Sequence, residues 1–539
     1  MPFLRKSLRL ASLAATSLRA RAAALALAAV AALAAPAHAE VRLARLFSDH
    51  MVVQRDRPLA LWGSAEPGEA ITVRFGGAQA KATAGKDGRW RATLPAFAAS
   101  REGRELVVAG KQSVTLQDVL VGDVWLCAGQ SNMEWGVGGC DEDLAALGAP
   151  TIRALKFGYV MATSPQDDVP AEHVAHPWQV ATPQSVGYFP AVGFFFAQRV
   201  QQAVDLPIGL INVAWGGTAI EPWLDPDGFA AVAELAEFRR AKLAEMAADV
   251  QALAPQLDRF EEWLKEARGA LAKGALPPAA PPAPNFPILN RTPFAIWNAK
   301  VAPLRGLGLK GILWYQGESN GDEGDSYFHK TRALVEGWRA FLGQGELPFY
   351  WVQLAAWQQP NDAPAGGDGW ARIRSAQAKA LVLPRTGMAV AIDAGDAADI
   401  HPHDKRTVGE RLARWALRDC YGQREMVVSG PLFRALEVRG AEAIVAFDHV
   451  GGGLMVGARE GRGAAREVEG GRLARFALAG ADRVWHWAAA RIDGPRVVVT
   501  AKEVPAPVAV RYAFSMNPAG ANLYNREGLP ASPFRSDDW

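Results

Sequence analysis

Four short segments of this 539-residue sequence place reactive or hydrogen-bonding side chains directly after apolar runs. The first is Gly129-Gln-Ser-Asn-Met133, which follows the apolar run 119–128. A serine at a glycine-marked turn into a helix exposes its hydroxyl, and the backbone N–H groups after it point at the group it attacks. Ser131 is therefore a candidate nucleophile. A role as helix N-cap fits the local sequence equally well.

Two further segments supply hydrogen-bond donors. Gly216 and Gly217 end a second apolar run, and glycines let backbone N–H groups approach a substrate oxygen closely. Gln316 and Asn320 end a third run and carry neutral amides, which suit a developing oxyanion. In the alternative interpretation, both pairs only form turns.

The fourth segment, 396–404, contains two histidines. His401 is the candidate general base for the serine, with Asp399 or Asp396 orienting its imidazole. A metal site at His401 and His403 is one alternative, but the sequence marks no third ligand. A surface loop is the other alternative.

The sequence predicts that an α/β fold with a parallel sheet positions these residues. Near-continuous apolar strands that alternate with helices are typical of parallel sheets. The predicted strands are 119–128, 208–214, 309–315, 349–354 and 387–393. The predicted helices are 193–204, 327–342, 370–382 and 404–417, the last with Asp404 as its cap. Because the carboxyl ends of parallel strands meet at one edge, we expect the four segments to form one acyl-transfer site.

The flanking sequence is organised differently. Residues 40–117 and 424–539 contain short apolar runs between Gly- and Pro-bearing turns, which predicts accessory β regions of the sandwich type. The α/β core is predicted over 118–423. Within it, 229–290 reads as a charged helical insertion that ends in a semi-rigid Pro/Ala tract, 277–287.

Composition limits the class of protein. Hydrophobic residues make up 50% and charged residues 21%, as in a globular chain, and the length predicts roughly two to four domains. The formal net charge is +2 without a basic cluster beyond the N-terminus, so no nucleic-acid partner is expected. Three cysteines are too few for a disulfide scaffold. Cys140 and Cys420 are one potential pair, whereas Cys127 fits a buried apolar position.

Residues 1–39 predict a secretory signal peptide. They carry five basic residues and no acidic one, followed by an Ala/Leu/Val run over 22–35 and Ala37-His-Ala39. The run is shorter than the ~20 apolar residues of a bilayer span, which makes a transmembrane anchor the weaker alternative. Cleavage near Ala39 leaves a mature chain of formal charge −3. We expect that chain to be periplasmic or extracellular, without stable membrane insertion.

These motifs resemble the sialate O-acetylesterase family of the SGNH hydrolases, which is related to the acetyl-xylan esterases. The resemblance runs along most of the chain and is weakest in the insertion. It rests on Leu46–Arg55, Leu61–Ala65, Gly122–Met133, Gly216-Gly217, Gln316–Asn320, Asp399–Pro402 and Asn522–Phe534.

The resemblance implies a serine carboxylic-ester hydrolase that removes O-acetyl groups from sugars, classically from sialic acids. It implies a three-layer α/β/α core with a parallel sheet, and neither a metal nor an organic cofactor. It places the nucleophile at Ser131 and the general base at His401. The oxyanion donors fall on the Ser131 amide, a glycine amide at 216–217, and the side chain of Gln316 or Asn320.

One departure from the family leaves a role open. The wider SGNH pattern has an acidic residue three positions before the histidine, and Ala398 stands there. Asp399 lies two positions before His401 and Asp396 five positions before it. Either carboxylate, or a backbone carbonyl in a Ser-His dyad, can therefore orient the ring.

Several alternatives remain for the function as a whole. The substrate can be an acetylated plant or microbial polysaccharide, and a lipid-acting esterase would need a long acyl channel. The many Trp residues also fit a non-catalytic glycan-binding protein, although Ser131 and His401 argue against it. Trp215 and Trp314 are candidate stacking faces for a sugar, with core packing as the alternative. The sequence does not specify an oligomeric state.

Overall fold

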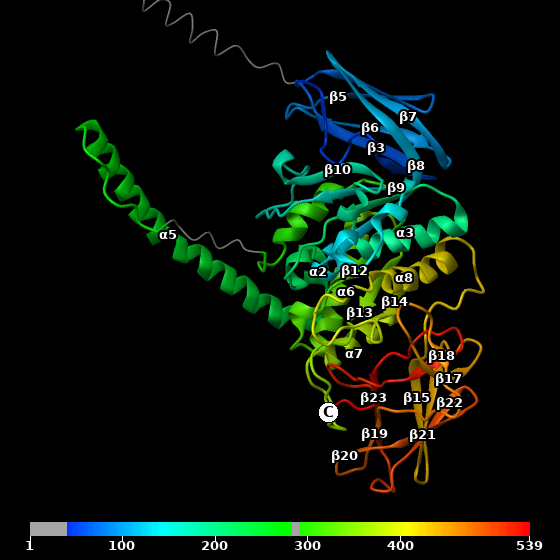
Figure 1. Ribbon diagram of the computed structural model, residues 1–539. Helices are drawn as coiled ribbons and strands as arrows, with labels where there is room; N and C mark the ends of the chain where they lie inside the picture. Colours follow the sequence, from blue (N-terminus) through cyan, green and yellow to red (C-terminus); the bar gives the residue numbers. More distant parts are fainter. Residues whose placement is uncertain (1–39, 283–289) are drawn as a thin grey trace, which may run out of the picture.

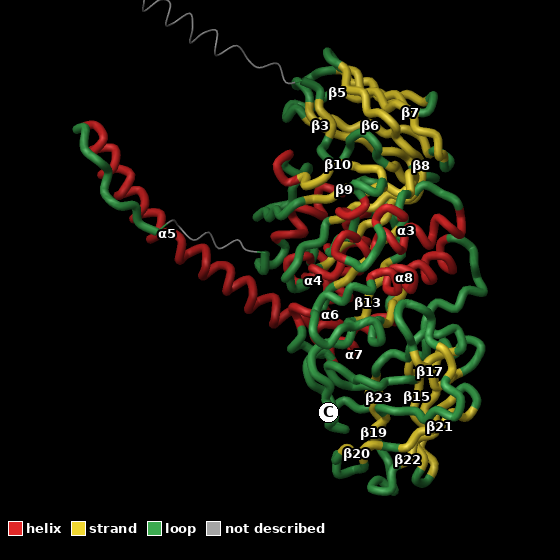
Figure 2. Tube along the Cα trace, in the orientation of Figure 1, coloured by secondary structure: helices red, strands yellow, loops and turns green. Residues whose placement is uncertain are grey.

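The computed structural model describes residues 40–282 and 290–539. The predicted signal peptide and the end of the Pro/Ala tract lie outside the described residues. The chain runs from an N-terminal β region through a helix-rich body to a C-terminal β region, with one long helix projecting from the body (Figures 1 and 2).

A mixed sheet forms the centre of the body. Its strand order is β10-β9-β11-β8-β12-β13-β14, with six parallel strands and β10 antiparallel at the edge. The bounds are β8 Ser113–Gly129, β9 Ala149–Phe157, β10 Val174–Ala181, β11 Ile208–Asn212, β12 Gly311–Tyr315, β13 Phe349–Gln353 and β14 Thr386–Val390. Every residue of β11 to β14 is buried, which explains their near-continuous apolar sequences. The strands predicted from these sequences are confirmed.

Helices cover both faces of the sheet. Neighbouring residues of β13 point to opposite faces. Phe349 packs on Trp338 of α6 with ring centroids 6.0 Å apart, and Tyr350 lies 6.4 Å from Trp415 of α8. Helix α3 packs beside α8, and α7 beside α6, so the α/β/α arrangement is confirmed. The helix bounds are α2 Ser131–Glu134, α3 Ala191–Val204, α4 Pro226–Ala231, α5 Ala236–Ala272, α6 Asp325–Leu342, α7 Ala371–Lys379 and α8 Lys405–Cys420.

The ends of two helices follow from their sequences. Helix α6 ends at Gly343, which adopts the left-handed conformation (φ 65°) that glycine tolerates. Helix α8 begins after Asp404, whose side chain accepts a hydrogen bond from the Thr407 N–H at 3.1 Å. The predicted cap at Asp404 is therefore confirmed.

The N-terminal β region is continuous with the body through β8. The first half of β8 pairs with β7, and its second half lies between β11 and β12. The expected boundary between 117 and 118 therefore falls inside one strand. The other bounds are β1 Arg42–Leu43, β2 Val52–Gln54, β3 Pro58–Ser64, β4 Ala70–Phe75, β5 Ala78–Thr83, β6 Arg89–Ala96 and β7 Ser100–Ala109. One hydrophobic core extends through both regions.

The C-terminal β region consists of three small sheets, with orders β15-β16-β22-β21, β18-β17-β24 and β20-β19-β23-β25. The bounds are β15 Leu432–Arg439, β16 Glu442–Asp448, β17 Leu454–Ala458, β18 Arg466–Glu467, β19 Phe476–Ala479, β20 Trp485–Trp487, β21 Ala489–Asp493, β22 Arg496–Thr500, β23 Ala509–Tyr512, β24 Leu523–Asn525 and β25 Phe534–Arg535. Val445, Val499 and Phe534 belong to a separate core there.

The cysteines and the helices settle two smaller points. Cys127, Cys140 and Cys420 are all free, so the potential pair Cys140–Cys420 does not form. Cys127 is buried in β8, as expected. Among the described helices, none combines the length and the apolar character that crossing a membrane requires.

Candidate active site

The structure brings Ser131 and His401 into contact. Ser131 is the first residue of α2, directly after the turn that ends β8, and Gly129 adopts φ 126° in that turn. A Cβ at position 129 would lie 2.2 Å from the Tyr315 carbonyl oxygen, so only glycine fits between β8 and β12. His401 comes from the segment between β14 and α8, and its Nε2 lies 2.9 Å from Ser131 Oγ. This distance is within hydrogen-bond range.

Asp399, and not Asp396, lies beside the imidazole of His401. The Asp399 Oδ1 atom accepts the His401 backbone N–H at 2.8 Å and lies 3.5 Å from His401 Nδ1. The Asp396 carboxylate accepts the N–H of Ala398 instead, at 2.8 Å. Of the two carboxylates that the sequence offers, Asp399 is therefore the one positioned to orient the ring. His403 Nδ1 faces Asp141 at 3.3 Å and does not approach the serine.

A buried network of polar side chains, Lys405, Asn132 and Glu318, lies next to the segment of His401. Lys405 Nζ donates to Asn132 Oδ1, and Asn132 Nδ2 donates to Glu318 Oε1 at 2.6 Å and to the Ile400 carbonyl at 3.1 Å. Burial lowers the pKa of Lys405 to about 8 and raises the pKa of Glu318. Asn132 thus connects the helix of the nucleophile to the segment of the base.

The environment of His401 favours its neutral form. Burial and the Lys405 cation lower the pKa of His401, while Asp399 acts in the opposite direction. Trp135 stacks on the imidazole at 4.8 Å with an interplanar angle of 18°. A neutral imidazole whose Nε2 meets the serine hydroxyl is ready to accept its proton.

Two backbone N–H groups, of the serine itself and of the glycine loop, lack an acceptor among the described residues. The amides of Ser131 and Gly217 donate to no other group in the described part of the chain. The Gly216 amide, in contrast, donates to Glu134 Oε2 at 2.8 Å. A Cβ at position 216 would lie 3.2 Å from Ser131 Cβ, so this loop passes directly beside the nucleophile.

The other two predicted oxyanion donors are engaged inside the protein. Gln316 has no exposed surface, and its Nε2 donates to Gln130 Oε1, the Thr218 carbonyl and Asn320 Oδ1 at 3.2, 3.2 and 2.7 Å. Asn320 Nδ2 donates to the carboxylates of Glu221 and Glu323. Neither amide is therefore free to bind a substrate oxygen in this structure. These contacts do not favour the oxyanion role that the sequence predicts for Gln316 and Asn320.

Gln130 is a candidate donor that the sequence reasoning missed. Its Oε1 accepts N–H groups from Gln316, Gly317 and Ser319 at 3.2, 3.5 and 3.2 Å, which fixes which end of the amide is oxygen. Its Nε2 donates to no group in the described residues. This nitrogen also keeps some accessible surface, so a substrate oxygen could reach it. In the sequence, only the position of Gln130 directly before Ser131 pointed to this role.

Aromatic and charged side chains surround the loop that contains Gly216 and Gly217. Tyr159, which is 56% exposed, stacks on Trp215 at 4.9 Å and donates to Glu134 Oε1 at 2.8 Å. Lys300 lies beneath, buried, and burial lowers its pKa to about 7. Trp314 is only 2% exposed and packs against Trp223, so it belongs to the core and offers no sugar-stacking face.

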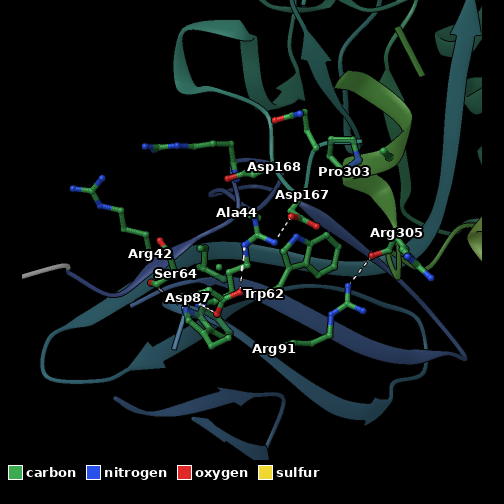
Figure 3. A pocket seen from close by; sticks show the side chains of 17 residues that line it. Arg42, Ala44, Trp62, Ser64, Asp87, Arg91, Asp167, Asp168, Pro303 and Arg305 are labelled. Atoms are coloured by element: carbon green, nitrogen blue, oxygen red, sulfur yellow. Dashed lines mark hydrogen bonds and ion pairs between the residues drawn. The ribbon is translucent and has the colours of Figure 1, made fainter. Parts of the chain in front are cut away.

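Several cavities of the described residues lie outside the Ser-His pair. One of about 560 Å³ runs between α5 and the loops after β11 and β12, where Ala219 and Ser319 line it. Another, of about 920 Å³, lies between the N-terminal sheet and the body and is lined by Trp62, Arg91 and Arg305 (Figure 3). The described residues contain no group of three His, Cys, Asp or Glu side chains arranged to hold a metal.

A serine hydroxyl, a neutral histidine and free backbone amides at the carboxyl edge of a parallel sheet define a serine esterase. A family model described as "Carbohydrate esterase, sialic acid-specific acetylesterase" matches residues 121–253 and 294–418. The chain belongs to this family of carbohydrate esterases, as the motifs suggested.

Individual relatives agree with this assignment. The sialate O-acetylesterase of Mus musculus is 28% identical over 445 residues, which cover 75% of this chain and 78% of that protein. The sialate O-acetylesterase of Homo sapiens is 28% identical over 438 residues, 74% of each chain. The crystal structure of a carbohydrate acetylesterase from Xanthomonas citri is 36% identical, with a TM-score of 0.75, and covers 92% of this chain and 100% of that one.

Proposed function

We propose that this protein removes O-acetyl groups from sugars and that O-acetylated sialic acids are its substrates. The contact of 2.9 Å between Ser131 Oγ and His401 Nε2, in a chain of this esterase family, carries the proposal. The names of the mammalian relatives support the sialate assignment.

The first half of the reaction forms an acetyl-enzyme. His401 Nε2 takes the proton of Ser131 as Oγ attacks the acetyl carbonyl carbon. The carbonyl oxygen becomes an oxyanion, which the free N–H groups of Ser131 and Gly217 and the amide of Gln130 are suited to stabilise. As the intermediate collapses, the bond to the sugar oxygen breaks, and His401 returns its proton to that oxygen.

The second half releases acetate. Water gives a proton to His401 as its oxygen attacks the acetyl-enzyme, and the same donors stabilise the second oxyanion. The Ser131 oxygen then leaves and regains its proton from His401. Asp399 and the stack of Trp135 keep the imidazole in place through both halves.

The small acetyl group leaves substrate choice to the sugar side. Tyr159 and Trp215 offer an aromatic surface next to the glycine loop, and sugar rings pack well on such faces. The side chain of His401 is 26% exposed, so the reacting pair can be reached from solvent.

Acetate release by the purified mature chain tests this proposal. The panel contains O-acetylated sialic acid, acetyl-xylan oligosaccharides and a long-chain ester. We expect release from the sialic acid, and the Ser131→Ala variant should lose at least about 10⁴-fold in kcat while its melting temperature stays unchanged.

The panel also separates the alternatives. Release from acetyl-xylan alone would overturn the sialate assignment and favour a polysaccharide acetylesterase, a class that fits the broader description of the Xanthomonas citri protein as a carbohydrate acetylesterase. Release from no substrate by folded protein would favour a glycan-binding role. Substantial activity in Ser131→Ala would contradict the nucleophile.

The family assignment is compatible with an exported enzyme, and we extend the proposal to export. The basic and apolar segments of residues 1–39 support cleavage near Ala39. The N-terminal sequence of protein recovered outside the cytoplasm should begin near Glu40. An uncleaved chain retained in the cytoplasm would contradict this.

A further inference from the structure

Helix α5 is unusually long and leaves the body of the protein. It spans 37 residues, or about 55 Å at 1.5 Å per residue. In Figures 1 and 2 it projects from the body, and most of its length lies away from the other elements. Helices of globular domains usually run about 8–20 residues, and a longer periodic helix suggests a coiled coil.

The apolar residues of α5 repeat every seven residues in two rows. The first row, here called the a row, consists of Leu243, Val250, Leu257, Leu264 and Leu271. The second row, called the d row, lies three positions further on and consists of Met246, Leu253, Phe260 and Ala267. All nine positions are apolar over four heptads. A repeat of 3.5 residues sustained this far is the signature of helices that wind around each other.

The d row is partly covered within the chain. Met246 lines the cavity between α5 and the loops after β11 and β12. Towards the tip of the helix, the chain turns back along it, where Trp263 Nε1 donates to the Pro278 carbonyl at 2.9 Å. Ala267 is buried there.

Four of the five a-row residues are exposed, and Leu264 is half-buried. Leu243, Val250, Leu257 and Leu271 are 44%, 61%, 45% and 62% exposed. Four large apolar side chains in line along one free helix are not scattered surface residues, and such a row marks an interaction surface. The 3.5-residue spacing specifies another helix as the partner.

We propose that α5 pairs with α5 of a second copy of this chain. Both copies then present the same seam, as a two-fold dimer requires. In a parallel pair, Gln256 meets Glu261 of the second copy, so no like charges face each other at this step of the seam.

The size of the seam suits a weak, concentration-dependent dimer. The a row runs from residue 243 to residue 271, about 42 Å at 1.5 Å per residue, and a strip of that length and one helix diameter wide covers on the order of 450 Å² on each copy. Stable interfaces bury about 600–1,000 Å² per partner, and weaker contacts bury less. Most of α5 projects away from the body that holds α2 (Figure 1), so we expect dimer formation and catalysis to be separable.

Light scattering coupled to size-exclusion chromatography tests the proposal on the full mature chain over a range of concentrations. Wild type should show twice the mass of one chain. The double variant Val250→Glu/Leu257→Glu should show a single chain, with an unchanged circular dichroism spectrum and unchanged hydrolysis of a small acetyl ester. The matched control Ala241→Glu/Ala248→Glu adds the same charges on the far side of α5 and should remain dimeric.

Three results would overturn the inference. A wild-type mass of one chain at all concentrations would mean that the a row does not join two copies, and would favour a helix of another protein as its partner. A dimer that survives Val250→Glu/Leu257→Glu would place the interface elsewhere. Loss of the dimer in both double variants would show an effect of charge and not of the seam. If the a-row variant misfolds, Leu257→Asn gives the same test with a milder change.

Discussion

His401 touches one carboxylate in two ways. Asp399 receives the backbone N–H of His401 and lies near Nδ1, but 3.5 Å is long for a strong hydrogen bond to the ring. The carboxylate therefore holds both the segment and the ring. A neutral amide at this position would weaken the hold and the stabilisation of the imidazolium.

Replacing the two carboxylates separately tests this assignment. We expect Asp399→Asn to lower kcat by about 10- to 10³-fold, less than for a short Asp-His bond. Asp396→Asn should stay near wild type because, within the described residues, the Asp396 carboxylate accepts a hydrogen bond from Ala398 and not from His401. Acetate release under saturating substrate measures both. Equal rates for the two variants and wild type would favour a Ser-His dyad.

The charge of Lys405 sets the pH range of the base. Burial and Lys405 lower the pKa of His401, so the acid limb of kcat/KM should lie below the ordinary histidine value of about 6.5. Lys405→Met removes the cation, which raises the pKa of His401, and the limb should move to higher pH. A pH–rate profile of both proteins measures the shift. An unmoved limb in a folded variant would contradict the coupling.

At the scale of elements, the segment 394–404 is the least regular part of the site, and the C-terminal β region holds both its ends. Arg459 donates to the Asp393 carbonyl at 2.8 Å and to Thr407 Oγ1 at 2.7 Å, and it pairs with Asp404. Arg411 clamps the Asp393 carboxylate with two bonds of 2.6 and 2.9 Å. His401 lies between these anchors.

Arg459 is therefore a positioning residue. Arg459→Gln should lower kcat by about 10- to 100-fold with a smaller change in KM, because small misplacement of a base is costly. Arg459→Lys should recover part of the loss. The matched control Arg466→Gln alters an exposed arginine of the same region and should behave as wild type. A loss confined to KM would contradict the positioning role.

Strands such as 309–315 and 349–354 could be predicted because a strand buried on both faces is apolar throughout. The direction of the Gln316 side-chain amide could not be predicted, since Tyr327 of α6 donates to its oxygen and Asn320 accepts from its Nε2. The role of Gln130 could not be predicted for the same reason, because three N–H groups that are distant in sequence orient its side chain.

At the scale of the whole molecule, one buried arginine joins the body to the C-terminal β region. Arg374 of α7 donates to the carbonyls of Leu354 and Ala355 at 2.8 and 2.6 Å, and to those of Ser515 and Met516 at 2.6 and 2.8 Å. It has no exposed surface, and burial lowers its pKa to about 9. Four carbonyls depend on this one guanidinium.

Without the Arg374 guanidinium, the body and the C-terminal β region should unfold at different temperatures. Arg374→Met leaves four buried acceptors without a donor, so we expect a loss of about 3 kcal/mol or more in the free energy of unfolding. Differential scanning calorimetry should show a lower melting temperature, with the C-terminal region unfolding first. Arg372→Met, at an exposed position of the same helix, is the control and should melt like wild type. Equal melting of both variants would contradict the connection.

The long strand β8 has a consequence for the ancestry of the protein. Residues 113–129 serve an accessory sheet at one end and carry the nucleophile turn at the other. A genetic exchange with its breakpoint inside this stretch would leave either the sheet or the serine without its backbone partners. We therefore expect the two regions to be inherited as one unit.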